Sequence, residues 1–111
     1  MAVTFKLNPE PTFRASVPIP VPGGGSMALD LEFRHKTRAA LHAWYDSFEG
    51  RDGDAARAEA ECLHEVVAGW HNCEAIYSLE ALTTLLENYP QAGGAILAAY
   101  TRELTGARLG N

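Results

Sequence analysis

The chain has 111 residues, 47% of them hydrophobic, which fits one domain with an ordinary core. Its net charge of −5 argues against a nucleic-acid partner, because such binding depends on basic contacts to phosphate. No stretch approaches the ~20 consecutive apolar residues that a membrane-spanning helix needs.

The cysteines and the first residues favour a reducing cytoplasm. Cys62 and Cys73 are too few for a disulfide framework, and they lack the CxxC spacing of many metal and redox sites. The opening Met-Ala-Val-Thr-Phe-Lys-Leu-Asn lacks the basic start and apolar run of a secretory signal peptide.

Residues 1–36 are predicted to form an arm followed by a β-hairpin. The arm contains Leu-Asn-Pro-Glu-Pro, in which two prolines disfavour a helix and favour an extended path. Two alternating segments then flank Gly23-Gly24-Gly25, and a period of two around a glycine-rich link is typical of a hairpin. The apolar faces of the two strands carry Phe13, Ala15, Val17, Ile19 and Val21, and Leu29, Leu31 and Phe33.

Pro18, Pro20 and Pro22 determine which edge of the first strand can pair. They fall at every second position, so the three missing N–H donors all lie along one edge. The other edge keeps the donors of Ile19 and Val21 for pairing. The first strand is therefore predicted to be an edge strand that resists pairing with stray chains. The alternative is a flexible Pro/Gly arm that orders only on a partner.

Residues 37–106 are predicted to form about four amphipathic helices. Thr37, Asp54 and Ser78 are the expected N-caps, and Gly50 and Gly106 the expected ends. The second helix is expected to run as far as Trp70, and Pro90 to start the fourth. Apolar stripes at helical spacing predict a core that includes Leu41, Trp44, Phe48, Leu63, Val67, Trp70, Leu82, Leu86, Tyr89, Ile96 and Tyr100.

The predicted fold class is therefore α+β and mainly α, with an N-terminal hairpin on a compact helical body. Residues 1–111 are expected to form a single domain, ending in a flexible tail over residues 107–111. Gly93-Gly94 inside the fourth helix suggests either close approach of another backbone or a late helix start.

The chemically reactive side chains do not form a convincing active site. His64-Glu65 begins like the zinc-protease motif HExxH, but the fifth residue is Ala68. The candidate metal ligands are Cys62, His64, His71 and Cys73. Cys62 and His64 would point apart on one helix, which argues against a shared metal ion. A paired-carboxylate site stays open, although no pair stands out. No catalytic, cofactor-binding or metal residue is assigned.

Several blocks of the sequence resemble the tail assembly chaperones of long-tailed phages and prophages. The opening Phe-Lys-Leu-Asn-Pro-Glu-Pro-Thr-Phe, residues Phe5 to Phe13, is the most specific together with Gly69-Trp70 and Asn88-Tyr89-Pro90. Residues 51–60 and 71–76 match less clearly. The other matching pieces are Ile19-Pro20-Val21-Pro22-Gly23, Phe33-Arg34-His35-Lys36-Thr37-Arg38, Val66-Val67-Ala68 and Leu104-Thr105-Gly106-Ala107-Arg108.

This resemblance implies a non-enzymatic protein of the bacterial host cytoplasm that is absent from the mature virion. Such proteins hold the tape measure protein before the tail tube polymerises around it, and they are expected to self-associate along it. Many also exist in a longer form, made by a −1 ribosomal frameshift, that recruits tail tube subunits. Leu109-Gly110-Asn111 can be encoded as CTG GGA AAC, which contains a slippery heptamer.

Self-association is predicted to use the arm and the hairpin. The candidate protein-contact residues are Phe5, Leu7, Phe13, Val17, Ile19 and Val21, and the alternative is that they only seal the chain's own core. Two other function classes are alternatives. One is a helical adaptor or inhibitor that binds one protein, and the other is a small metal-dependent enzyme using His64 or His71.

Overall fold

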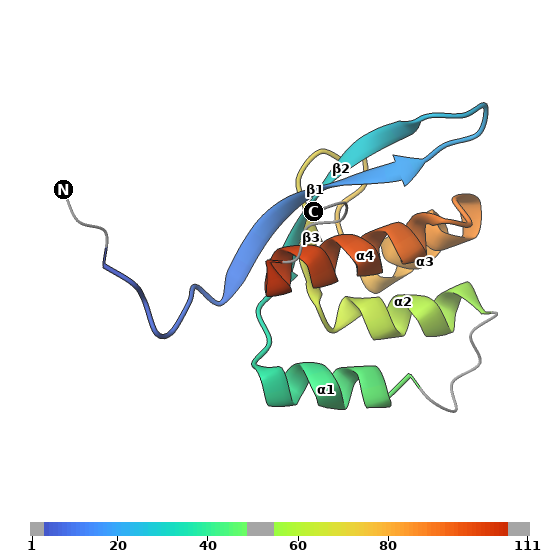
Figure 1. The fold of residues 1–111 in the computed structure, drawn as a ribbon. Helices are drawn as coiled ribbons and strands as arrows, with labels where there is room; N and C mark the ends of the chain where they lie inside the picture. Colours follow the sequence, from blue (N-terminus) through green and yellow to red (C-terminus); the bar gives the residue numbers. More distant parts are fainter. Residues whose placement is uncertain (1–3, 49–54, 107–111) are drawn as a thin grey trace.

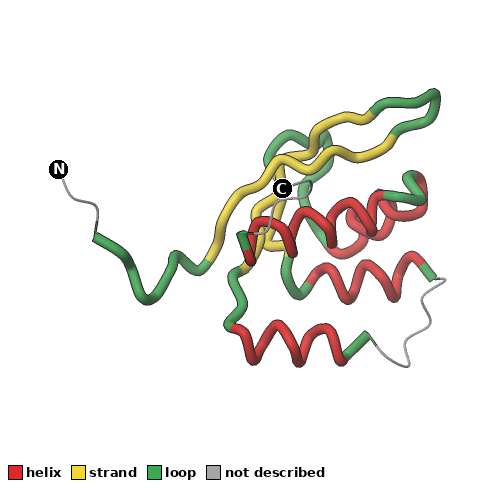
Figure 2. Tube along the Cα trace, viewed as in Figure 1, coloured by secondary structure: helices red, strands yellow, loops and turns green. Residues whose placement is uncertain are grey.

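A three-stranded antiparallel sheet is covered on one side by helices (Figures 1 and 2). The computed structural model describes residues 4–48 and 55–106. The predicted α+β class is confirmed. The strands are β1 (Thr12–Pro20), β2 (Ser26–Arg34) and β3 (Val67–Trp70), and the helices are α1 (Arg38–Asp46), α2 (Ala56–His64), α3 (Leu79–Asn88) and α4 (Ala92–Thr105).

The predicted hairpin is confirmed, with β1 and β2 antiparallel along their whole lengths. The backbone N–H of Val21 donates to the carbonyl oxygen of Gly25 over 3.2 Å and closes the turn. Gly23, Gly24 and Gly25 have φ angles of 93°, 89° and 85°. Glycine adopts such angles without a steric penalty, which explains the run of three at this turn.

The prolines lie on the outer edge of the sheet, as predicted. The strand order β1-β2-β3 leaves β1 at an edge. Since bonded pairs alternate along an antiparallel ladder, the Val21–Gly25 bond directs the donors of Ile19 and Val17 towards β2. Pro18 and Pro20 therefore occupy positions whose missing N–H groups would face outwards.

The prediction that the second helix extends to Trp70 is wrong. Helix α2 ends at His64, and Val67–Trp70 instead forms β3, which pairs with the inner edge of β2 through Leu31 and Trp70. The β-branched pair Val66-Val67 and the following Gly69 disfavour a helix. Pairing with the open edge of β2 gives this segment backbone hydrogen bonds. Because these residues have low helix propensity, the strand is favoured over an extension of α2.

Arg34 joins the end of α2 to the start of β3. Its Nη1 atom donates to the carbonyl oxygens of His64, at 2.9 Å, and Val67, at 2.8 Å. Its backbone N–H donates to the carbonyl of Val66 over 2.6 Å. Carbonyls at a helix end have no partner within the helix and attract positive charge, so Arg34 stabilises the chain reversal there.

The helix caps follow the sequence where the structure describes them. The hydroxyls of Thr37 and Ser78 accept bonds from Ala40 N–H, at 3.2 Å, and Ala81 N–H, at 3.0 Å. Gly106 ends α4 with a φ of 73°. Helix α1 ends at Asp46, and α4 begins at Ala92 rather than at Pro90. The expected end at Gly50, the cap at Asp54 and the tail 107–111 lie outside the described residues.

Tyr100 of α4 lies at the centre of the core. It is fully buried, and its ring contacts Phe33, at a centroid distance of 5.1 Å, and Trp44, at 5.5 Å. Its hydroxyl donates to the carbonyl of Arg34 over 2.8 Å, and burial raises its pKa to about 12. Of the other predicted core residues, Leu63, Val67, Leu82, Leu86 and Ile96 are buried, and Leu41, Phe48, Trp70 and Tyr89 pack against the core half-buried.

Gly93 lies against a side chain of another helix. A β-carbon at this position would collide with the Glu59 carboxylate of α2, whereas Gly94 faces open space. Desolvation raises the pKa of Glu59. The close approach is therefore to a carboxylate, not to another backbone as predicted, and the alternative of a late helix start is also wrong because α4 begins before both glycines.

This contrast predicts opposite outcomes for the same substitution at adjacent positions. Gly94→Ala should raise the free energy of unfolding by about 0.5–1 kcal/mol, because alanine restricts the unfolded chain and favours helix. Gly93→Ala should lose that gain because Glu59 must move. Urea titration checks both values, and in a Glu59→Ala background Gly93→Ala should become stabilising. Equal effects of the two glycine substitutions in the native background would refute this interpretation.

Arg34→Met keeps the aliphatic stem but removes both side-chain hydrogen bonds to carbonyls. We expect the free energy of unfolding to fall by about 1–2 kcal/mol, because bonds made by charged groups contribute about 1.5–3 kcal/mol and water partly replaces those of the exposed Arg34. Arg14→Met is the matched control on β1, because Arg14 makes an exposed ion pair with Asp30 at 3.9 Å, and such pairs contribute at most about 1 kcal/mol. Equal losses in thermal or urea unfolding would contradict the role assigned to Arg34.

Candidate functional site

An apolar groove lies between the hairpin end and α3. Its volume is about 600 Å³, within the range typical of binding pockets. The hairpin forms one wall, and the outward face of α3 forms the opposite wall. The lining residues are Ile19, Val21, Met27, Ala28, Leu29, Trp70, Asn72, Cys73, Glu74, Ala75, Ala81, Thr84, Leu85, Asn88 and Tyr89.

The connection between β3 and α3 supplies the third side of the groove and is held by Trp70 and Tyr77. The indole Nε1 of Trp70 donates to the carbonyl of Ala75 over 2.7 Å. The Trp70 and Tyr77 rings meet edge to face at 5.0 Å. The Tyr77 hydroxyl lies 2.8 Å from Nδ1 of His64, and burial raises the pKa of Tyr77 to about 12. The connection therefore has a defined shape.

Asn72 continues the sheet beyond the end of β3. Its Oδ1 accepts from the backbone N–H of Asp30 over 2.8 Å, and its Nδ2 donates to the carbonyl of Ala28 over 3.0 Å. The side-chain amide thus pairs with β2 as a neighbouring strand would. This leaves the first part of β2, including Met27, as a free wall of the groove.

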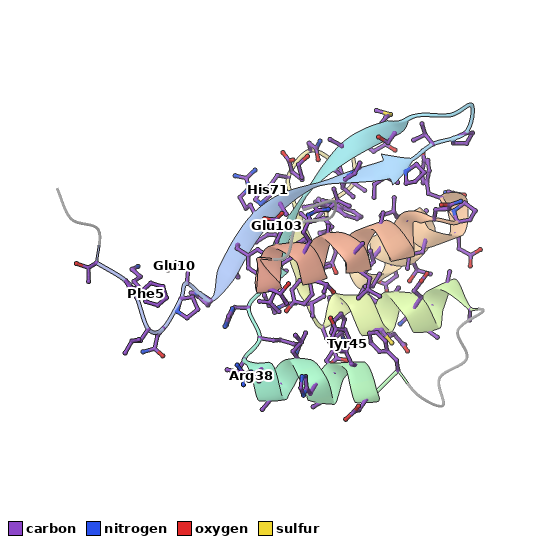
Figure 3. All side chains as sticks on the ribbon, in the orientation of Figure 1. Phe5, Glu10, Arg38, Tyr45, His71 and Glu103 are labelled. Atoms are coloured by element: carbon purple, nitrogen blue, oxygen red, sulfur yellow. The ribbon has the colours of Figure 1, made fainter. Side chains whose placement is uncertain are left out.

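The exposed large apolar side chains lie at two ends of the molecule. Phe5 and Leu7 are 86% and 89% exposed, on an arm that projects away from the helices (Figure 3). Met27, 69% exposed, lines the groove, and Ile76, 92% exposed, lies in the connection beside it. These four side chains contribute little to the stability of the chain that carries them.

The structure places the other candidate contact residues differently. Val17 is fully buried and Ile19 is 4% exposed, and Val21 lines the groove with Ile19. Phe13 is half-buried, with its ring 5.6 Å from that of Phe33. These residues hold the hairpin on the helices, so a partner could reach few of their atoms.

The histidines and cysteines lie in separate environments. His64 contacts Tyr77, whereas Nε2 of His71 lies 3.0 Å from Oε1 of Glu32. Hydrogen bonds from Thr12 and then His71 lower the pKa of Glu32. Cys62 is buried and Cys73 lines the groove. Within residues 4–48 and 55–106, no three His, Cys, Asp or Glu residues converge as a metal site would require.

The whole chain, residues 1–111, matches the family model described as phage tail assembly chaperone. The chain belongs to this family. The resemblance inferred from the opening block and the Asn-Tyr-Pro motif is thereby confirmed. No curated protein and no solved structure shows significant similarity to it. None of the helices in the described ranges is long and apolar enough to cross a membrane.

Membership of this tail assembly chaperone family makes protein partners in tail assembly the expected ligands, and such a family is generally non-enzymatic. The sequence-based prediction lacks the groove because it places the residues of β3 in a helix. The signal that could have found it was Val66-Val67 followed by Gly69-Trp70, a pattern that suits a short strand better than a helix.

Proposed function

We propose that this chaperone binds the tape measure protein and self-associates along it before the tail tube closes around it. The observation that carries the proposal is the arm, where Phe5 and Leu7 are almost fully exposed. Exposed apolar side chains outside the folded body are expected in a protein whose contacts form only with partners. Membership of the tail assembly family supports the same conclusion.

A chaperone for so long a partner must cover it with many copies and then leave. Contacts made by a few apolar side chains suit this requirement, because each is weak and reversible. The net charge of −5 keeps separate copies soluble. The work is done by binding alone, with no catalytic step, in the host cytoplasm, and the protein is not retained in the mature virion.

A longer form of the protein is also part of the proposal. The codons for Leu109-Gly110-Asn111 are expected to read CTG GGA AAC or to supply an equivalent slippery heptamer. A −1 shift there would add an extension that recruits tail tube subunits. Sequencing this region of the gene, followed by mass spectrometry of infected cells, checks the prediction. Codons without a slippery site and a single product ending at Asn111 would refute it.

Co-expression tests the main function. The tape measure protein encoded in the same phage genome should aggregate alone and become soluble when this chain is present. Affinity purification should then recover several copies of the chaperone for each tape measure chain, as quantified by amino-acid analysis. A discrete complex with one copy would favour an adaptor instead. An insoluble tape measure protein that never copurifies would exclude the proposed function.

A further inference from the structure

We infer that the N-terminal arm of one copy docks in the apolar groove of a second copy. The inference rests on the proposed function, because it names the contact by which the chaperone would self-associate. The arm carries the exposed Phe5 and Leu7, and the groove of about 600 Å³ lies at the far end of the same molecule.

The arm has the pattern of an extended ligand. Phe5 and Leu7 are two residues apart, so in extended backbone they point to the same side, about 7 Å from each other. Pro9 and Pro11 disfavour a helix and favour an extended path when the arm binds. In the free chain the arm bends at Leu7 and Asn8, and Lys6 pairs with Glu10 at 2.6 Å on the exposed surface.

The groove offers matching chemistry. Met27 and Leu85 belong to opposite walls of the groove, and the Trp70 indole lies between β3 and the connection that follows it. These apolar surfaces can accept one aromatic and one aliphatic side chain. Glu74 is the charged residue that lines the groove, and Lys6 is the charged residue among residues 4–8. Arm and groove are therefore complementary in charge as well as apolar character.

The arm cannot reach the groove of its own chain. It leaves β1 at Thr12, at the start of the strand (Figure 1). The groove lies beside Ile19, near the other end of the strand. Reversal of direction takes about four residues. The part of the arm left to run back, from Phe5 to Asn8, spans only about 10 Å, whereas Ile19 lies about 23 Å along the strand from Thr12. An arm that docks in the groove must therefore come from another copy.

A contact between two different surfaces of the same chain has a consequence for assembly. Each copy keeps a free arm at one end and a free groove at the other, so addition continues head to tail unless the rotation between copies closes a ring. The contact is smaller than a standard stable interface, so single pairs are weak and short-lived. Many such contacts add up only when a long partner holds the copies together.

Two variants and their mixture test this geometry in the full chain. Phe5→Ser with Leu7→Ser removes the arm anchors, and Met27→Glu places a carboxylate in the groove. Each should weaken concentration-dependent association by at least about tenfold in analytical ultracentrifugation. A 1:1 mixture should form dimers that grow no further, because it contains one intact arm and one intact groove. Absence of such dimers would overturn the inference.

Matched controls separate docking from general surface effects. Asn8→Ser changes a polar arm residue and leaves Phe5, Lys6 and Leu7 in place, and Ile76→Glu introduces the same charge at an exposed side chain that does not line the groove. Both should associate like the native chain. Equal weakening by Ile76→Glu and Met27→Glu would refute docking in the groove. Circular dichroism should match the native protein for every variant, since all these positions are exposed.

A cross-link identifies the partner site directly. Leu7→Cys places a thiol on the arm, and Cys73 already lines the groove. Mild oxidation should give a reducible ladder of dimers and longer species, with residue 7 joined to Cys73 in mass spectrometry. Leu7→Cys combined with Cys73→Ser should abolish the ladder. Linkage within one chain, or between two copies of residue 7, would contradict head-to-tail docking.

The tape measure co-expression experiment separates this inference from the proposed function. If the arm variant fails to self-associate and still solubilises the tape measure protein, docking stands and template binding is independent of it. If the arm variant self-associates normally while Met27→Glu loses the tape measure protein, the groove receives that partner and the inference fails. In that second case the proposed function remains.

Discussion

The Arg34 guanidinium holds together the two halves of the structure. It bonds to carbonyls of His64 and Val67, which are the last residue of α2 and the first of β3. Carbonyls at the end of α2 have no partner within the helix, and the positive charge of Arg34 stabilises them there. The Tyr100 hydroxyl donates to the backbone carbonyl of the same residue, which brings α4 to this point. Hairpin, reversal and α4 therefore meet at one position.

One edge of the hairpin stays unpaired and the other is paired, because they differ in backbone N–H donors. Pro18 and Pro20 remove outward donors from β1, whereas β2 presents a complete edge that β3 and then the Asn72 amide occupy. Because β3 is short, the pairing stops before the end of the hairpin. The groove is the space that remains between this unpaired end and α3, so its existence follows from how little of β2 is covered.

Much of this fold could be predicted from local patterns, because the responsible interactions are local. The alternation from Phe13 to Val21, the glycine turn and the Thr37 and Ser78 caps each involve neighbours in sequence. Strand β3 has only one local signal, Val66-Val67 before Gly69-Trp70, because its partner on β2 lies more than 30 residues earlier and its apolar spacing also fits a helix. The groove depends on that long-range pairing and on Asn72, so local patterns alone do not predict it.

The rest of the fold keeps the arm exposed, which suits a protein that binds partners. An apolar arm that could fold back into the groove of its own chain would block both surfaces for other copies. The length of β1 together with Pro9 and Pro11 prevents this. Pro18 and Pro20 in β1 limit uncontrolled strand pairing, which would otherwise compete with reversible association. A chain built in this way favours weak contacts between copies and disfavours permanent ones. The proposed function, in which the chain covers a long partner and later releases it, requires that balance.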